Sequence, residues 1–140
     1  MNTLTIQDIN TITTKDITKD ITEIIEQSQR VAYSTIDLVL LKRNWLIGKR
    51  IYEEEFKKTR KENYGKEIIK TLAGNLSKKY GGGFDTKTLY KYVKFYTMYK
   101  NIFASVRRQS FLSWTHYRLL IRITNKDARE WYEKELMELK

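Results

Sequence analysis

The sequence predicts an all-α protein, and three observations favour this fold class. The 140 residues include no proline, and Lys, Glu, Leu and Ile are plentiful. Apolar residues form 41% of the chain and recur at helical spacing, whereas the alternation typical of strands is scarce. We expect five or so helices, with a helix-turn-helix (winged-helix-like) core and a long amphipathic N-terminal helix. The length fits a flexible lead-in over residues 1–15 and a single helical domain over 16–140.

The long amphipathic helix is predicted to begin at about Asp16. Pairs of apolar residues recur every seven residues, which places a continuous stripe on one helix face. These pairs are Ile24/Ile25, Val31/Ala32, Leu38/Val39 and Trp45/Leu46. Between Ile36 and Ile47 the sequence is apolar on several sides, so we expect this part to be buried all round. The stripe is expected to pack mainly on its own domain, with oligomerisation as a second use; Gly48 is not an obvious break.

Two shorter helices joined by a glycine turn follow at about residues 66–99. The first, over 66–79, has a buried face of residues that fall four apart. These are Ile68, Leu72 and Leu76. Gly81–Gly83 permit positive φ and end this helix, and Asp85 or Thr86 can cap the next one. The arrangement is typical of a helix-turn-helix.

The helix predicted over about residues 86–99 has one basic and one apolar side. At 100° per residue, three lysines and a tyrosine share one face, opposite a cluster of apolar side chains. The basic face holds Lys87, Tyr90, Lys91 and Lys94, and the core arc holds Leu89, Tyr92, Val93 and Tyr96. We place Phe95 and Tyr99 outside this arc, packed against the long first helix. The pattern favours a recognition helix that offers cations and hydrogen-bond donors to a groove.

Positive charge is concentrated between Lys57 and Lys94. This block holds eleven Lys/Arg and three acids, so its net charge is +8, against +10 for the whole chain. Such asymmetry favours a cationic face for a polyanion, although a solvated lysine surface is the alternative. We expect flanking phosphate contacts from Lys66, Lys70, Lys78, Lys79, Arg107 and Arg108.

The C-terminal part is predicted to add two more helices. Residues 100–112 are irregular and carry at most a weak pattern for a short β-wing. A fourth helix is expected over about 114–123, and a fifth from about residue 125 or 126 to the end.

The composition argues against several classes of protein. The chain has no cysteine and one histidine, which excludes disulfides and His- or Cys-rich metal sites. No apolar run approaches the ~20 residues that span a bilayer, and no signal-peptide core is present, so we expect a cytoplasmic protein without membrane contact. We expect no cofactor.

Catalytic sites are weakly indicated. The Glu-X-Lys tripeptides of some nucleases occur at Glu55–Lys57 and Glu138–Lys140, but in helical patterns rather than on adjacent strands. His116 has no partner that the sequence places beside it, so we expect it to pack or hydrogen-bond near a helix start, with Ser113 as an N-cap. We therefore predict that the chain is not an enzyme.

Several strings resemble the N-terminal domain of YhcG-like proteins over roughly residues 30–137. They are Trp45-Leu46-Ile47-Gly48, Tyr64-Gly65-Lys66, Gly81-Gly82-Gly83-Phe84, Leu89-Tyr90, Phe95-Tyr96, Leu112-Ser113-Trp114-Thr115-His116-Tyr117-Arg118 and Ala128-Arg129-Glu130. The resemblance implies a helix-turn-helix DNA-binding module that precedes a PD-(D/E)XK nuclease domain in bacterial proteins of DNA metabolism or defence. Here Thr88 replaces the family's Asn, and Tyr92-Val93 replaces its Met-Arg; if the family's Asn and Arg read bases, the sequence preference of this chain is changed or lost.

Two functional hypotheses follow from these observations. The first is a module that binds double-stranded DNA, mainly through phosphate contacts and with modest sequence preference. The second is an oligomerisation or docking module for a nuclease partner, with no direct DNA contact. A homodimer through the long N-terminal helix is compatible with both hypotheses, since helix-turn-helix proteins often bind as dimers.

Overall fold

The computed structural model describes residues 4–10, 13–57, 64–104 and 111–139. Its helices are η1 (Ile6–Asp8, a 3-10 helix), α1 (Ile17–Lys57), α2 (Tyr64–Tyr80), α3 (Thr86–Met98), α4 (Trp114–Leu120) and α5 (Lys126–Glu138). No strand occurs in these ranges, and the prediction of an all-α fold is confirmed. The expected β-wing falls largely on residues 105–110, outside the described residues, and stays a prediction.

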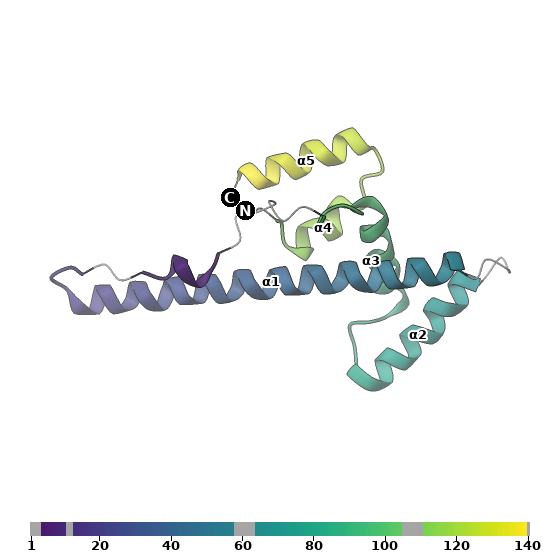
Figure 1. Ribbon diagram of the computed structural model, residues 1–140, viewed down its shortest axis with the longest axis horizontal. Coiled ribbons are helices and arrows are strands. Elements are labelled where there is room, and N and C mark those ends of the chain that lie inside the picture. The colour runs from purple at the N-terminus through teal and green to yellow at the C-terminus, as the bar shows by residue number, and fades with distance from the viewer. Residues whose placement is uncertain (1–3, 11–12, 58–63, 105–110, 140) are drawn as a thin grey trace.

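The long helix α1 forms the axis of the molecule. It runs unbroken for 41 residues, which is about 60 Å at 1.5 Å per residue. Its start is fixed by the Asp16 carboxylate, which accepts hydrogen bonds from the backbone amides of Thr18 and Lys19 at 3.0 and 3.3 Å. Figure 1 shows α3, α4 and α5 gathered over the C-terminal half of α1, with α2 on the other side. The N-terminal half of α1 extends beyond this body.

Residues 4–10, part of the expected lead-in, lie back along the N-terminal half of α1. The Leu4 amide donates to the Ser34 hydroxyl at 3.3 Å, and the Asn10 amide donates to the Gln27 side-chain carbonyl at 2.6 Å. Because Gln27 and Ser34 are seven residues apart, both contacts fall on one face of α1. The flexibility predicted for this segment stays a prediction.

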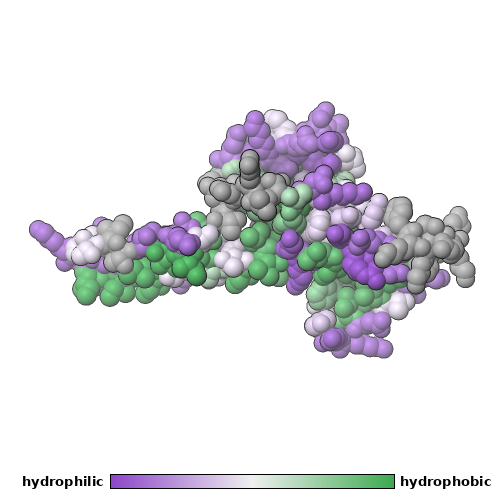
Figure 2. Space-filling view, in the orientation of Figure 1, coloured by the Kyte–Doolittle hydropathy of each residue, from purple (hydrophilic) through white to green (hydrophobic). Residues whose placement is uncertain are grey.

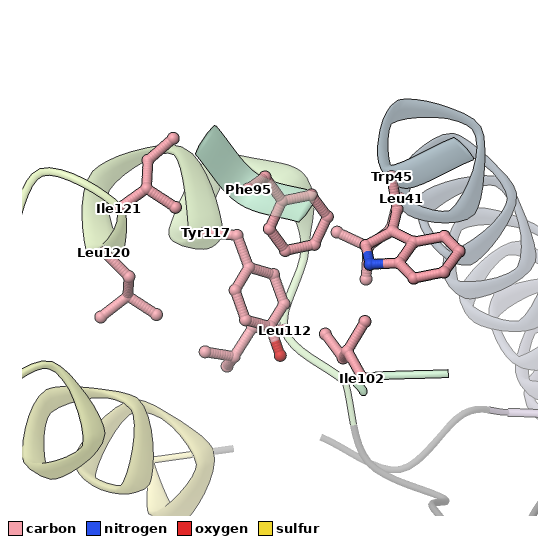
Figure 3. Close-up of a cluster of buried hydrophobic side chains, with 8 residues drawn as sticks. All are labelled: Leu41, Trp45, Phe95, Ile102, Leu112, Tyr117, Leu120 and Ile121. Atoms are coloured by element: carbon pink, nitrogen blue, oxygen red, sulfur yellow. The ribbon is translucent and has the colours of Figure 1, made fainter. Parts of the chain in front are cut away.

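The core is built from two clusters of buried side chains around α3. The larger joins α1, α3, α4 and the loop between α3 and α4. Figure 3 shows Phe95 and Tyr117 in its middle, with residues of α1 on one side and the end of α4 on the other. It consists of Leu41, Trp45, Phe95, Ile102, Leu112, Tyr117, Leu120 and Ile121. The smaller joins α1, α2 and α3 through Ile51, Ile69, Ala73, Leu89 and Tyr92. Phe95 is fully buried and shares the larger cluster with Leu41 and Trp45 of α1, which confirms the predicted packing against the first helix. Its burial by α4 as well was not predicted, because periodicity within α3 cannot show it.

Helices α1 and α3 cross at Gly48. A Cβ atom at this position would lie 2.0 Å from the Tyr92 carbonyl oxygen and 2.5 Å from its carbonyl carbon. Only the absence of a side chain allows the two backbones to come this close. Gly48 is therefore the contact point of the two helices rather than a break in α1.

The prediction that residues 36–47 are buried all round is wrong. Leu41 and Asn44 are buried, but Ile36 is 53% exposed, Val39 61% and Leu46 46%. The reason is geometric, because the body of the protein covers one side of α1 only. A second apolar face of this helix is left in solvent.

Candidate nucleic-acid interface

The turn between α2 and α3 determines where the basic helix points. Gly81 and Gly83 adopt φ of 79° and 104°, the left-handed region that residues with a Cβ rarely enter. The Gly81 amide donates to the Ser77 carbonyl at 2.9 Å and closes the end of α2. Asp85 then caps α3 by accepting the Thr88 amide at 2.8 Å. The connection of residues 81–85 is slightly longer than the 3–4 residues usual in a helix-turn-helix.

The Asp85 carboxylate stays ionised in this turn, and its charge stabilises the start of α3. Its pKa lies below the ordinary value because the side chain and then the backbone of Thr88 hydrogen-bond the ionised form. Lys91 and Lys87 lower this pKa further through their charge. At neutral pH the cap is therefore ionised and holds the first turn of α3 in place.

Helix α3 separates its basic and apolar residues as predicted. Leu89, Tyr92 and Phe95 are at most 3% exposed. Lys87, Tyr90, Lys91 and Lys94 are all exposed. These lysines fall at spacings of four and three, so their amines lie along one side of the helix for about 10 Å. Within the described parts of the chain, none of the three lysines takes part in an ion pair, so their charges are available to a ligand.

Four of the six predicted flanking cations lie on α2. Lys66, Lys70, Lys78 and Lys79 are exposed on α2. Lys79 Nζ lies 5.4 Å from the centre of the Tyr80 ring, so its stem follows this aromatic side chain. Arg107 and Arg108 lie outside the described residues.

The residues considered for catalysis lie far apart in the sequence, on α1, α4 and α5. Among the described residues there is no group of three or more His, Cys, Asp or Glu side chains that could hold a metal ion. Both Glu-X-Lys tripeptides fall in or at the end of helices, α1 and α5. His116 is half-buried near the start of α4, and its Nδ1 lies 3.1 Å from the Ser113 hydroxyl. Ser113 occupies the N-cap position, but its side chain makes no capping hydrogen bond.

Two features of the structure were not predicted from the sequence. The first is the role of Gly48, which the sequence pattern cannot show because the close approach involves the backbone of a distant helix. The second is the exposed apolar face of α1, for which a signal was available. Every charged residue between positions 17 and 40 avoids one side of the helix.

In the described chain, no helix is both long enough and apolar enough to span a bilayer.

Comparison with protein families shows that residues 20–140 match the DUF1016 N-terminal domain. No curated protein and no solved structure matches the chain.

Proposed function

The chain belongs to the DUF1016 N-terminal domain family, the N-terminal domain of YhcG-like proteins, and from this premise we propose that it binds double-stranded DNA through α3. The single observation that carries the proposal is the pair of opposite faces on this helix. One face is anchored by side chains that are almost fully buried, and the other presents three unpaired lysines and a tyrosine. A rigid helix with this division can lie in a groove while its core side stays packed.

Phosphate contacts supply most of the affinity in this proposal. Lys87, Lys91 and Lys94 are point charges on flexible stems, which suit backbone phosphates better than base edges. Exposed lysines on α2 extend the contact to neighbouring phosphates. Each neutralised phosphate releases condensed counterions, so the affinity falls steeply with salt concentration.

Sequence preference is expected to be modest because the positions that differ from the family cannot read bases well. Tyr92 is 3% exposed and packs edge-on against Trp114, with the ring centres 5.2 Å apart. Val93 is half-buried and has no hydrogen-bonding side chain. Thr88 lacks the bidentate amide with which Asn recognises adenine. Tyr90, 45% exposed, is the side chain best placed to contact a base or sugar.

The decisive experiment compares two triple variants with equal loss of charge. Changing Lys87, Lys91 and Lys94 to Ala is expected to weaken duplex binding about 100-fold at ~0.1 M salt and to reduce the slope of log K against log salt by about 2.7. The control changes Lys15, Lys19 and Lys134, which are exposed elsewhere. Its affinity should fall far less. Equal losses of affinity in both variants would mean that binding depends only on the net charge of the chain, and would refute a specific binding surface on α3.

Competition identifies the form of nucleic acid. A labelled duplex bound to the chain is challenged with unlabelled duplex, single-stranded DNA and RNA of the same sequence. The proposal expects the duplex to be the best competitor. Preferential displacement by single strands would instead favour stacking on Tyr90 and its aromatic neighbours.

The same proposal implies that the chain acts together with a nuclease. The resemblance to YhcG-like proteins implies a targeting module that brings a nuclease domain or subunit to DNA in the bacterial cytoplasm, and this module itself performs no catalysis. A second function, assembly without DNA contact, is favoured by the exposed apolar face of α1. Mass measurement with and without duplex separates the two: a stable oligomer indifferent to DNA would favour assembly.

A further inference from the structure

The exposed side of α1 forms a continuous apolar surface. Along this side, residues recur at alternating spacings of four and three, the pattern of a coiled-coil seam. They are Ile21, Ile25, Ser28, Ala32, Thr35, Val39, Lys42 and Leu46, called here the α1 seam. Figure 2 shows hydrophobic residues along the N-terminal half of α1 on the side turned away from residues 4–10. Ile21 is 50% exposed, Ile25 52% and Val39 61%, so no part of the chain that the structure describes covers the seam.

The two halves of the seam have complementary shapes. The N-terminal half carries a row of exposed isoleucines, Ile21 and Ile25 with Ile17 before them, and it extends beyond the protein body. The C-terminal half borders an apolar groove with a volume of about 650 Å³. The groove is lined by Leu38, Val39, Leu46, Ile47, Phe103 and Phe111, with Lys42 and Arg43 among them. A ridge and a groove on one face allow two copies of the chain to fit one another.

We propose that this face binds a second copy of the chain, with the two α1 helices antiparallel. A two-fold axis between Tyr33 and Ser34 places each seam residue opposite another: Ile21 faces Leu46, Ile25 faces Lys42, Ser28 faces Val39, and Ala32 faces Thr35 of the second copy. The isoleucine row of each chain then enters the groove of the other. Ala32, a small residue beside the axis, permits close approach of the helices.

The polar members of the seam can be buried in this dimer without losing hydrogen bonds. The Ser28 hydroxyl donates to the Ile24 carbonyl at 2.8 Å, and the Thr35 hydroxyl donates to the Val31 carbonyl at 2.9 Å. Lys42 can keep its stem in the groove, because its Nζ already lies 4.7 Å from the centre of the Phe103 ring. The two hydroxyls are therefore not left unpaired when the seam is covered.

Charge favours the antiparallel arrangement over the parallel one. Residues 16–26 carry four carboxylates and one lysine, whereas residues 42–50 carry four cations and no acid. The antiparallel dimer brings these oppositely charged segments side by side at both ends. A parallel dimer would place Lys42, Arg43 and Arg50 near their own copies, with a repulsive cost.

The exposed apolar area is sufficient for such a dimer. Six aliphatic side chains on this side, each about half exposed or more, are Ile17, Ile21, Ile25, Ile36, Val39 and Leu46. Together they present on the order of 600 Å² per chain, close to the ~800 Å² that each partner buries in an interface of standard size. Monomeric proteins seldom leave a larger continuous patch in water. The inference depends on this face alone and does not require DNA binding.

Sedimentation of the 140-residue chain tests the dimer directly. Over about 1–300 µM, the proposal expects a concentration-dependent approach to twice the chain mass of 16.8 kDa. Ile21→Glu and Leu46→Glu should each weaken association at least about 100-fold, because every dimer contains two copies of the change. Tyr33→Glu is the matched control, since Tyr33 is 66% exposed but lies off the seam. A monomer throughout this range, or a dimer that tolerates both seam variants, would overturn the proposal.

Disulfide trapping tests the antiparallel register, and the chain offers a clean background because it has no cysteine. Ile21→Cys and Leu46→Cys chains are prepared separately, mixed and gently oxidised. The proposal expects mixed disulfides between the two variants to form at least tenfold faster than disulfides within either variant alone. Faster linking of like variants would show a parallel pair and refute the register.

Discussion

Replacing Gly48 with alanine tests the crossing of α1 and α3, on which the position of the basic helix depends. The new methyl group would lie 2.0 Å from the Tyr92 carbonyl oxygen, so this atom would have to move by about 1.4 Å to reach ordinary contact at 3.4 Å. Overpacking costs up to about 3 kcal/mol when backbone must shift. Alanine returns about 1 kcal/mol because it favours the helix more than glycine does. We expect a net loss of about 2 kcal/mol in the free energy of unfolding.

The control for this prediction is Gly74→Ala on α2. Gly74 is exposed and has negative φ, and a Cβ there would meet no atom within 4 Å. This variant keeps the propensity gain without the clash and should be more stable than the parent by about 0.5–1 kcal/mol. Urea unfolding followed by circular dichroism gives both values. If Gly48→Ala matched or exceeded the parent in stability, α1 and α3 would not cross at this point.

Two further predictions concern how α3 and α5 are held. Because the pKa of Asp85 is lowered in the fold, its ionised cap stabilises α3 above the unfolded pKa of about 3.9, and this stabilisation is lost as the pH falls below that value. The variant Asp85→Asn caps the helix without titrating, so the advantage of the parent in melting temperature should shrink between about pH 6 and pH 3. A constant difference in melting temperature would contradict this prediction. The fully buried Tyr117 donates its hydroxyl to Glu133 at 3.2 Å, so Tyr117→Phe should lose about 1 kcal/mol in urea unfolding. An unchanged stability would mean that this bond does not help to dock α5 on α4.

Local patterns in the sequence were sufficient to predict the helices and the division of α3. The triple glycine marks the end of α2, and the Asp85 cap marks the start of α3; both depend on a few adjacent residues. The lysine face of α3 follows from periodicity, because this short helix is covered by the body on one side. Whether the face binds DNA stays a prediction.

Contacts between distant segments could not be predicted in the same way. Phe95 is buried because Tyr117 and Trp114 of α4 reach it, with ring centres at 5.2 and 5.3 Å. No spacing within α3 contains this information. The burial of residues 36–47 was overestimated for the converse reason: apolar residues on all sides of a helix are consistent with a surrounding core, but also with a helix covered on one side by its own body.

The position of Trp114 has a consequence for how the protein unfolds. Its ring meets Tyr92 from the smaller cluster and Phe95 from the larger, with the centres 5.2 and 5.3 Å apart. Because one residue bridges the two hydrophobic clusters, we expect the region that holds the lysines in place to open together with the C-terminal third of the chain. A destabilising substitution in α4 would then increase the rate of amide hydrogen exchange in α3, although a loop separates the two helices. The rigidity that the proposed DNA-binding surface requires would thus come from a part of the protein that need not touch DNA at all.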